Sequence, residues 1–263
     1  MTAATPERAA VAAARAQEIL ERGYTVFERA YTEAEVEFLR SRILAAWEEL
    51  GRPTLYTSPP AHPRQDIEIG PAGMVLLGIT QRYPETAARL YKLPIIDTLR
   101  ALLGEDMHLE LPAGALSDPS RPFFDWHVHI DGVDDAYYEN KRPFPSFTRS
   151  LRVNHVLYLD DLTAEMGRLL VYPRRITDPT PPPFNRQQPC WPGMVEIDCP
   201  RGSVVVIEQC TWHAAYPKRS PGVRAFVGSY FAAAGSTMTP LAPRDLATWD
   251  GEDELFRSLL RCR

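Results

Sequence analysis

The sequence predicts a single domain in which N-terminal helices pack against a mainly β core of the sandwich or barrel type. The first hundred residues carry helical signals, whereas short β-type runs alternate with proline- and glycine-rich breaks from residue 107 onward. A length of 263 residues fits one such domain, which we expect to span residues 1–263.

The helical part has clear start and stop signals. Residues 7–22 are rich in alanine and end before Gly23, and residues 24–27 form a short β-prone run. Thr32 and Glu35 then have the spacing of a capping box, which predicts a helix that ends at Gly51. A further helix is expected from about residue 94 to 103, so residues 1–105 form a mostly helical flank.

The β part consists of short apolar runs bounded by turn residues. We expect residues 106–235 to form the core and 236–263 a C-terminal segment. Residues 174–193 contain too many prolines for regular structure and are interpreted as a lid-like loop over a pocket, with a surface linker as the alternative. The predicted strands are MHLEL, FFDWHVHI, SLRVNHVLYL, RLLVYP, MVEIDC, SVVVIEQC and VRAFVGSYFA.

Composition excludes several classes of protein. A net charge of −5 does not fit a general nucleic-acid-binding surface, and the four cysteines lack the CxxC spacing of a zinc ribbon. The N-terminal residues have no apolar signal-peptide core, and no apolar run has the length of a membrane span. We therefore expect a cytoplasmic protein with a small-molecule substrate and with no nucleic-acid or membrane partner; the sequence does not indicate an oligomeric state.

The stretch WHVHIDG, residues 126–132, presents three side chains that can bind a metal. His127, His129 and Asp131 alternate, so on a strand they would share one face, about 7 Å apart from one to the next. Two neighbours can reach one ion, either His127 with His129 or His129 with Asp131. A His-x-Asp/Glu spacing occurs by chance about once in a chain of this composition, so the motif needs a third ligand to be informative.

His213 is the candidate third ligand because it follows the apolar strand in RGSVVVIEQCTWHAA. Two histidines and one carboxylate would form the facial triad of non-haem iron oxygenases. A site of three histidines, 127, 129 and 213, is the competing interpretation, and zinc-dependent hydrolysis is a third use of such ligands.

Arg224 favours the oxygenase. It lies eleven residues after His213 in a β-type run with apolar neighbours, where a guanidinium could hold a dicarboxylate cosubstrate bidentately. His127, Tyr137 and Trp191 are candidates for the substrate pocket. Other arginines, Arg121, Arg149 and Arg152, are expected to be solvated charges, and His155 is expected to be a core or surface residue.

Four stretches together resemble the phytanoyl-CoA dioxygenase family of iron(II)- and 2-oxoglutarate-dependent oxygenases. They are GYTVF with the helix that follows, WHVHID, NHVLYLDDLTAEMGRLLVYPRR, and RGSVVVIEQCTWHAA with the later RAFVGSY. Their order and spacing, over residues 23 to 231, carry the likeness.

The resemblance implies a double-stranded β-helix, or jelly roll, flanked by helices. It also implies iron(II) bound by His129, Asp131 and His213, and 2-oxoglutarate bound by Arg224, with O2 as the second cosubstrate. The chain departs from the family pattern at three places. Relatives commonly have Trp-His as the start of the His-x-Asp motif, which would make His127 the first ligand and put His129 where the acid belongs. Relatives also often have Gly-Ser-His at residues 173–175 and serine at Ala215. Asn154 and Tyr158 are therefore candidates for the second anchor of the cosubstrate.

The expected reaction is hydroxylation of an aliphatic C–H bond in a natural-product intermediate, amino acid or acyl derivative, with release of succinate and CO2. Asp131 argues against halogenation, since halogenases of this group replace that carboxylate. Desaturation, epimerisation and ring formation use the same ligands, so they stay open. The alternative is a three-histidine or other cupin-like metal dioxygenase or hydrolase that does not use 2-oxoglutarate.

Overall fold

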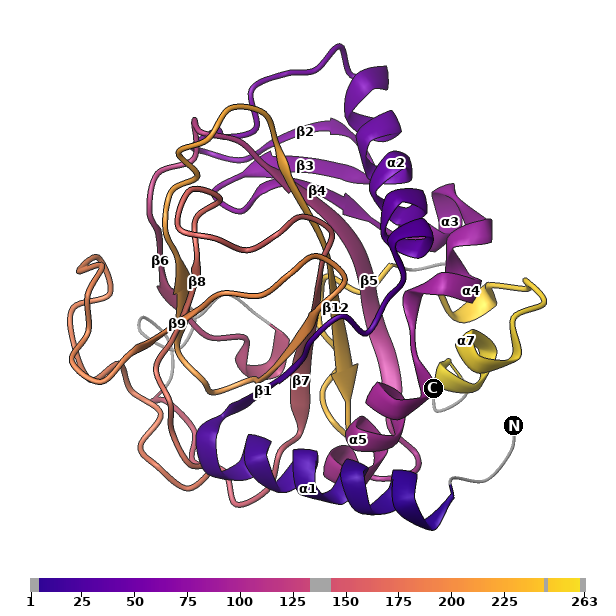
Figure 1. The fold of residues 1–263 in the computed structure, drawn as a ribbon, viewed down its shortest axis with the longest axis vertical. Helices are drawn as coiled ribbons and strands as arrows, with labels where there is room; N and C mark the ends of the chain where they lie inside the picture. Colours follow the sequence, from indigo (N-terminus) through magenta and orange to yellow (C-terminus); the bar gives the residue numbers. More distant parts are fainter. Residues whose placement is uncertain (1–4, 133–142, 244–245, 261–263) are drawn as a thin grey trace.

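Two antiparallel sheets form the core of the protein in a computed structural model, which describes residues 5–132, 143–243 and 246–260 (Figure 1). The larger sheet has the strand order β1-β10-β7-β12-β5-β4-β3-β2, and the smaller has the order β6-β11-β8-β9. The central strands of the larger sheet are β5 (His108–Ser117), β7 (Arg152–Tyr158), β10 (Val204–Glu208) and β12 (Arg224–Ala232). The smaller sheet contains β6 (Phe124–His127), β8 (Leu169–Val171), β9 (Val195–Ile197) and β11 (His213–Ala215).

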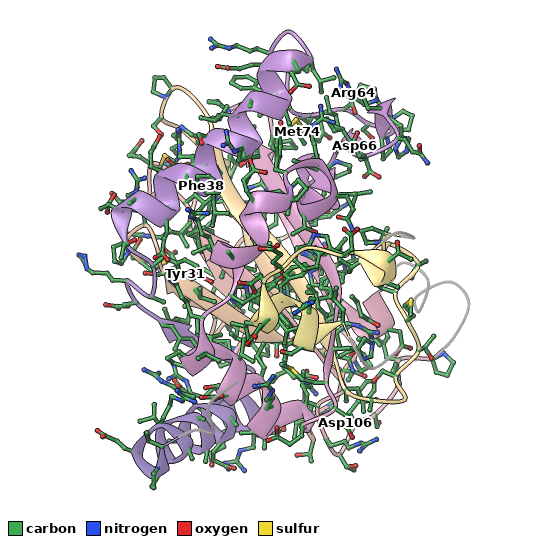
Figure 2. The ribbon with its side chains drawn as sticks, turned by 90° about the vertical axis from the view of Figure 1, so that its right-hand side faces the viewer. Tyr31, Phe38, Arg64, Asp66, Met74 and Asp106 are labelled. Carbon is green, nitrogen blue, oxygen red and sulfur yellow. The ribbon has the colours of Figure 1, made fainter. Side chains whose placement is uncertain are left out.

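Helices cover the outer face of the larger sheet, and the smaller sheet lies on its other side (Figure 1). Figure 2 views the molecule from the helical side, where Tyr31, Phe38 and Met74 are labelled. The main apolar core fills the space between these helices and the sheet. The helices are α1 (Pro6–Arg22), α2 (Glu33–Glu49), α3 (Ile79–Arg82), α4 (Ala87–Leu90), α5 (Leu93–Leu103) and α7 (Glu254–Leu259).

Several sequence predictions are confirmed. Helix α1 ends at Gly23, whose φ of 81° is the left-handed conformation that glycine adopts without steric cost. Thr32 and Glu35 make the predicted capping box at the start of α2. The jelly-roll class with flanking helices is also confirmed, because both sheets are antiparallel and the chain passes repeatedly from one sheet to the other.

The expectation that residues 1–105 are mostly helical is incomplete. This region also contributes β1 (Tyr24–Phe27), which pairs with β10, and a meander of β2 (Ala61–Arg64), β3 (Ile67–Gly70) and β4 (Gly73–Leu77). Strand β4 pairs with β5 and so extends the larger sheet. Strand β1 confirms the predicted β-prone run over residues 24–27, whereas β2, β3 and β4 are not predicted. These three strands are too short for periodicity to reveal, and pairing that begins at β5 stabilises them.

Residues 174–193 lie against the outer side of the smaller sheet. The indole of Trp126 donates a hydrogen bond to the carbonyl of Gln188, at 3.0 Å, and the indole of Trp212 donates to the carbonyl of Thr180, at 2.9 Å. None of the described residues that line the cavity between the sheets comes from this segment. The structure therefore does not place the predicted lid over that cavity.

Candidate functional site

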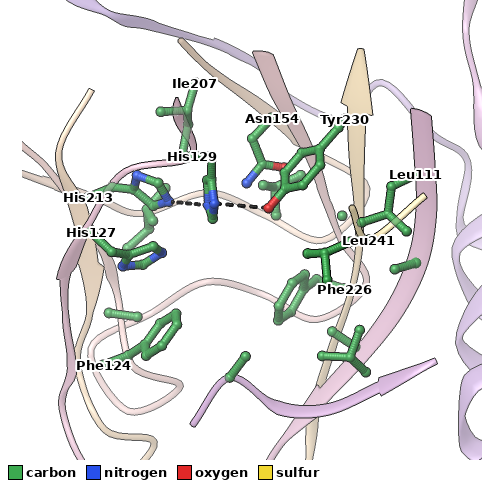
Figure 3. A pocket seen from close by; sticks show the side chains of 18 of the residues that line it. Leu111, Phe124, His127, His129, Asn154, Ile207, His213, Phe226, Tyr230 and Leu241 are labelled. Atoms are coloured by element: carbon green, nitrogen blue, oxygen red, sulfur yellow. Dashed lines mark hydrogen bonds between the residues drawn. The ribbon is translucent and has the colours of Figure 1, made fainter. Parts of the chain in front are cut away.

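Three imidazole rings converge at the inner side of the smaller sheet. His127 ends β6, His213 begins β11, and the two are paired across these strands. His129 is held nearby because its backbone N–H donates to the carbonyl of Gln209, at 2.9 Å, just before β11. One ring nitrogen from each histidine lies within 4.8 Å of the others, and Figure 3 shows the rings side by side.

Each ring is oriented through its Nδ1 atom. The Nδ1–H groups of His127 and His213 donate to the carbonyls of Asp125 and Thr211, at 2.7 and 2.9 Å, which leaves a lone pair on both Nε2 atoms. Nδ1 of His129 lies 2.9 Å from the hydroxyl of Tyr230, which can donate or accept. The Tyr230 contact therefore allows His129 to present either Nε2–H or an Nε2 lone pair.

The three rings are suited to a metal ion. Nε2 of His129 lies 3.1 Å from Nε2 of His213, and two nitrogens bound at right angles to one ion at about 2.1 Å would be about 3 Å apart. Burial lowers the pKa of His213 to about 4 and the pKa values of His127 and His129 well below 6.5. Neutral imidazoles with anchored Nδ1 atoms are the form that binds iron, zinc or copper.

Asp131 does not join this group, so the predicted combination of His129, Asp131 and His213 is not the one the structure brings together. The assumption that strand alternation continues to residue 131 is wrong, because β6 ends at His127 and residues 130–132 form a 3-10 turn. Asp131 has a φ of 54°, and its carboxylate lies 3.9 Å from the guanidinium of Arg152. The left-handed turn thus directs the carboxylate toward Arg152 rather than toward His213.

The histidines open onto a cavity between the two sheets (Figure 3). The side opposite the imidazoles is apolar and comes from β4, β5, β12 and residue 241. Figure 3 shows Leu111, Phe226 and Leu241 there, facing the histidines across the cavity. The apolar residues include Val75, Leu77, Leu111, Ala113, Ala115, Phe226 and Leu241.

The predicted cosubstrate residues line the same cavity. Arg224 is 3% exposed, and one of its terminal nitrogens donates to the carbonyls of Gly167 and Met166. Its Nε has no hydrogen-bond partner among the described residues, nor does Oδ1 of Asn154. Tyr158 is buried on the same face, and burial raises the pKa of its hydroxyl, which stays protonated as a hydrogen-bond donor.

Arg121 also lines the cavity, although a solvated charge was expected at this position. It is 3% exposed, and its guanidinium lies over the ring of Phe124 at 5.2 Å. Its sequence context, DPSRPFF, has the appearance of a surface turn, so no local signal marks it. Arg152, also expected to be solvated, is fully buried and pairs with Glu110 at 2.7 Å.

The remaining pocket candidates have different positions. His127 lines the cavity, as well as lying in the histidine group. Trp191 is not on the cavity: it stacks on Trp126 with ring centroids 4.2 Å apart, in a separate apolar cluster. Tyr137 lies outside the described residues.

The chain belongs to the phytanoyl-CoA dioxygenase (PhyH) family, whose model matches residues 19–226. As a member of this family it is a 2-oxoglutarate-dependent non-haem iron oxygenase, with iron(II) as its cofactor and 2-oxoglutarate and O2 as its cosubstrates. The converging neutral imidazoles fit such an ion. No curated protein matches the chain.

Solved structures share the fold. The carbocyclase SnoK from nogalamycin biosynthesis, described as non-heme and alpha-ketoglutarate-dependent, superposes with a TM-score of 0.60 at 18% identity, over 88% of this chain and 87% of SnoK. The epimerase SnoN from the same biosynthesis gives 0.59 at 15% identity, over 93% and 89%. HygX from Streptomyces hygroscopicus, with nickel and 2-oxoglutarate bound, gives 0.58 at 13% identity over 90% of each chain.

A membrane-spanning helix is not found among the described residues, since none of their helices combines the necessary length and apolar character.

Proposed function

We propose that the chain binds iron(II) through His127, His129 and His213 and uses 2-oxoglutarate to hydroxylate an aliphatic C–H bond of a small molecule. The observation that carries this proposal is that three anchored imidazoles and the buried Arg224 share one cavity. Arg224 would bind the distal carboxylate of 2-oxoglutarate, with Asn154 and Tyr158 as further polar contacts.

The ligand set His127, His129 and His213 is favoured over the set that contains Asp131. Among the described residues, the backbone hydrogen bonds of His127 and His213 go to Nδ1, and Nδ1 of His129 contacts Tyr230, so no backbone hydrogen bond to Nε2 is found. The Asp131 carboxylate instead lies 3.9 Å from the guanidinium of Arg152. The family register supports the same choice, since Trp126-His127 then occupies the Trp-His position and His129 occupies the position of the acid. The alternative is the set that contains Asp131. Metal binding to variants of His127 and Asp131 distinguishes the two sets.

Iron with 2-oxoglutarate and O2 would supply the oxidising chemistry that breaks the C–H bond. The side chains of this chain would position the reactants: the three imidazoles would hold the metal, and Arg224 would orient the cosubstrate. The apolar residues opposite the histidines exclude water and offer an apolar surface to the substrate.

Hydroxylation is favoured over halogenation because three protein ligands remain in this arrangement. A halogenase needs a position vacated by a protein ligand to admit halide, and His129 fills the position of the family carboxylate. Epimerisation or ring formation would use the same ligands, and a substrate screen separates these outcomes by product mass.

The direct test is succinate release from 2-oxoglutarate by iron-reconstituted protein, alone and with a panel of small apolar molecules, natural-product intermediates and amino acids. We expect iron-dependent succinate formation that a true substrate accelerates, together with a product 16 mass units heavier. His213→Ala should abolish turnover, and His155→Leu, on the other face of the sheet, should retain it. Oxygen consumption that needs iron but not 2-oxoglutarate would instead support a three-histidine dioxygenase of another type.

A further inference from the structure

Two buried guanidinium groups lie at the same end of the cavity. Ser117, the last residue of β5, pairs with Arg224, the first residue of β12, and the chain then turns through Asp118 toward Arg121. This turn returns Arg121 to the cavity, so both arginines line it while each is only 3% exposed. Their positive charges are close enough that Arg224, after burial, is the second cause that lowers the pKa of Arg121 to about 9.

Neither guanidinium has a carboxylate partner among the described residues. Nε and Nη2 of Arg121 and Nε of Arg224 are buried without hydrogen bonds. Buried cations are costly unless an anion compensates them. Burial lowers the pKa of Arg224, and Asp160 is close enough to oppose this shift, but it does not form an ion pair with either guanidinium.

The carboxylates that are near are engaged elsewhere. Asp160 accepts hydrogen bonds from Nε of Arg40 at 3.0 Å and from the backbone N–H of Ala225 at 2.7 Å. Asp118 accepts from the backbone N–H groups of Leu55, at 3.2 Å, and Ser120, at 2.9 Å. Neither carboxylate forms an ion pair with Arg121 or Arg224. The N–H groups of these arginines that have no hydrogen bond therefore remain available to a ligand.

We infer that Arg121 is the second anchor of the cosubstrate and that it shares the distal carboxylate of 2-oxoglutarate with Arg224. This inference rests on the proposed function. A carboxylate has two oxygens with about four acceptor positions, enough for both guanidinium groups. Tyr158 lines the same cavity, and its buried hydroxyl would supply a third donor to the carboxylate.

The strength of the contact follows from its charge. Ala215 also lines the cavity, and its methyl group offers no hydrogen bond to a carboxylate. Arg121 is a charged donor, and charge-assisted hydrogen bonds are about twice as strong as neutral ones. The consequence is strong selection for a 2-oxo acid with a distal carboxylate.

The test compares two ligands on anaerobic, iron(II)-loaded protein by calorimetric titration. One is 2-oxoglutarate, and the other is 2-oxopentanoate, which has the same chain length but a methyl group in place of the distal carboxylate. Arg121→Gln should weaken 2-oxoglutarate binding about 10- to 100-fold and change the affinity for 2-oxopentanoate less than about twofold. Arg121→Lys should recover part of the loss. Arg174→Gln, which removes another buried guanidinium outside the cavity, should bind both ligands like the wild type.

A second readout separates a binding role from a structural one. Removal of an uncompensated buried charge should raise the melting temperature of metal-free Arg121→Gln by about 2–4 °C. A lower melting temperature together with wild-type affinity for 2-oxoglutarate would overturn the inference and assign Arg121 a packing role. The proposed function fails differently: in that case the wild type itself would not bind 2-oxoglutarate more tightly than 2-oxopentanoate.

Discussion

Strands β7 and β12 have an apolar face and a face that carries several polar side chains. On the face toward the helices, Val153, Leu157, Val227 and Phe231 join the main apolar core. On the face toward the cavity, the alternate residues are Asn154, Val156, Tyr158, Arg224, Phe226, Gly228 and Tyr230. The same two strands therefore build a closed core on one side and a binding cavity on the other.

The two faces also contain histidines with opposite surroundings. His155, on the core side, is enclosed by the rings of Tyr91 and Phe231, and burial lowers its pKa to about 4. It belongs to no group of three possible metal ligands among the described residues. His129 and His213, on the cavity side, have the same neutral state but point at a common position. Convergence of the rings, rather than burial or protonation state, therefore distinguishes the site from the core.

The largest effect expected from this comparison concerns the two phenylalanines of β12. Phe231→Ala removes a fully buried ring and should lower the free energy of unfolding by about 3–5 kcal/mol. Phe226→Ala should cost about 1–2 kcal/mol, because its ring lines a cavity and is only partly buried. Urea denaturation of both variants measures the difference, and equal losses would mean that the cavity is as tightly packed as the core.

A smaller, pH-dependent effect is expected at Glu208, at the end of β10. Burial raises its pKa from 4.5 to about 7, so the folded state resists ionisation. The unfolded chain ionises first as pH rises, so the carboxyl destabilises the fold increasingly between about pH 4.5 and 7 and by a constant amount above that. Glu208→Gln should therefore match the wild type near pH 4.5 and be more stable by up to about 3 kcal/mol at pH 8.

Thermal unfolding from pH 5 to pH 8 checks this prediction. A stability difference that does not change with pH would contradict it, because loss of a hydrogen bond to the backbone N–H of Cys210 has no such dependence.

The smallest effect concerns the hydroxyl that orients His129. Tyr230→Phe removes the partner of Nδ1 and should weaken metal binding about 10- to 100-fold without loss of the fold. Tyr91→Phe is the matched control. Tyr91 is a buried tyrosine whose hydroxyl donates a hydrogen bond to Ser229, and Ser229 lies on the core face of β12. Competition with a chelator measures the metal affinity of both variants. Equal affinities would contradict an orienting role for the Tyr230 hydroxyl.

Local signals predicted much of the fold. The capping box at Thr32 and the glycine after α1 are decided by neighbouring residues, so the sequence contains the information. The seven β-type runs after residue 107 each contain a strand. The sequence does not predict the meander of β2, β3 and β4. Pairing with β5, rather than the composition of these strands, stabilises the meander.

The candidate site was predictable in type but not in detail. His129, His213 and Arg224 follow from spacing, and the structure places them on one cavity. The placement of Asp131 depends on a left-handed turn after β6, and the burial of Arg121 depends on a turn that returns it to the cavity. Both are tertiary features, so alternation along a strand misplaces the first and a surface-like sequence conceals the second.

The three-histidine site is tested most directly by the iron content of two asparagine variants after anaerobic reconstitution and desalting. Asparagine tolerates the left-handed conformation at residue 131, so Asp131→Asn removes the carboxylate charge without backbone strain, and His127→Asn is its match. We predict that Asp131→Asn retains about one iron per chain and that His127→Asn loses it. Iron retained by His127→Asn and lost by Asp131→Asn would contradict the three-histidine site and restore the triad with a carboxylate.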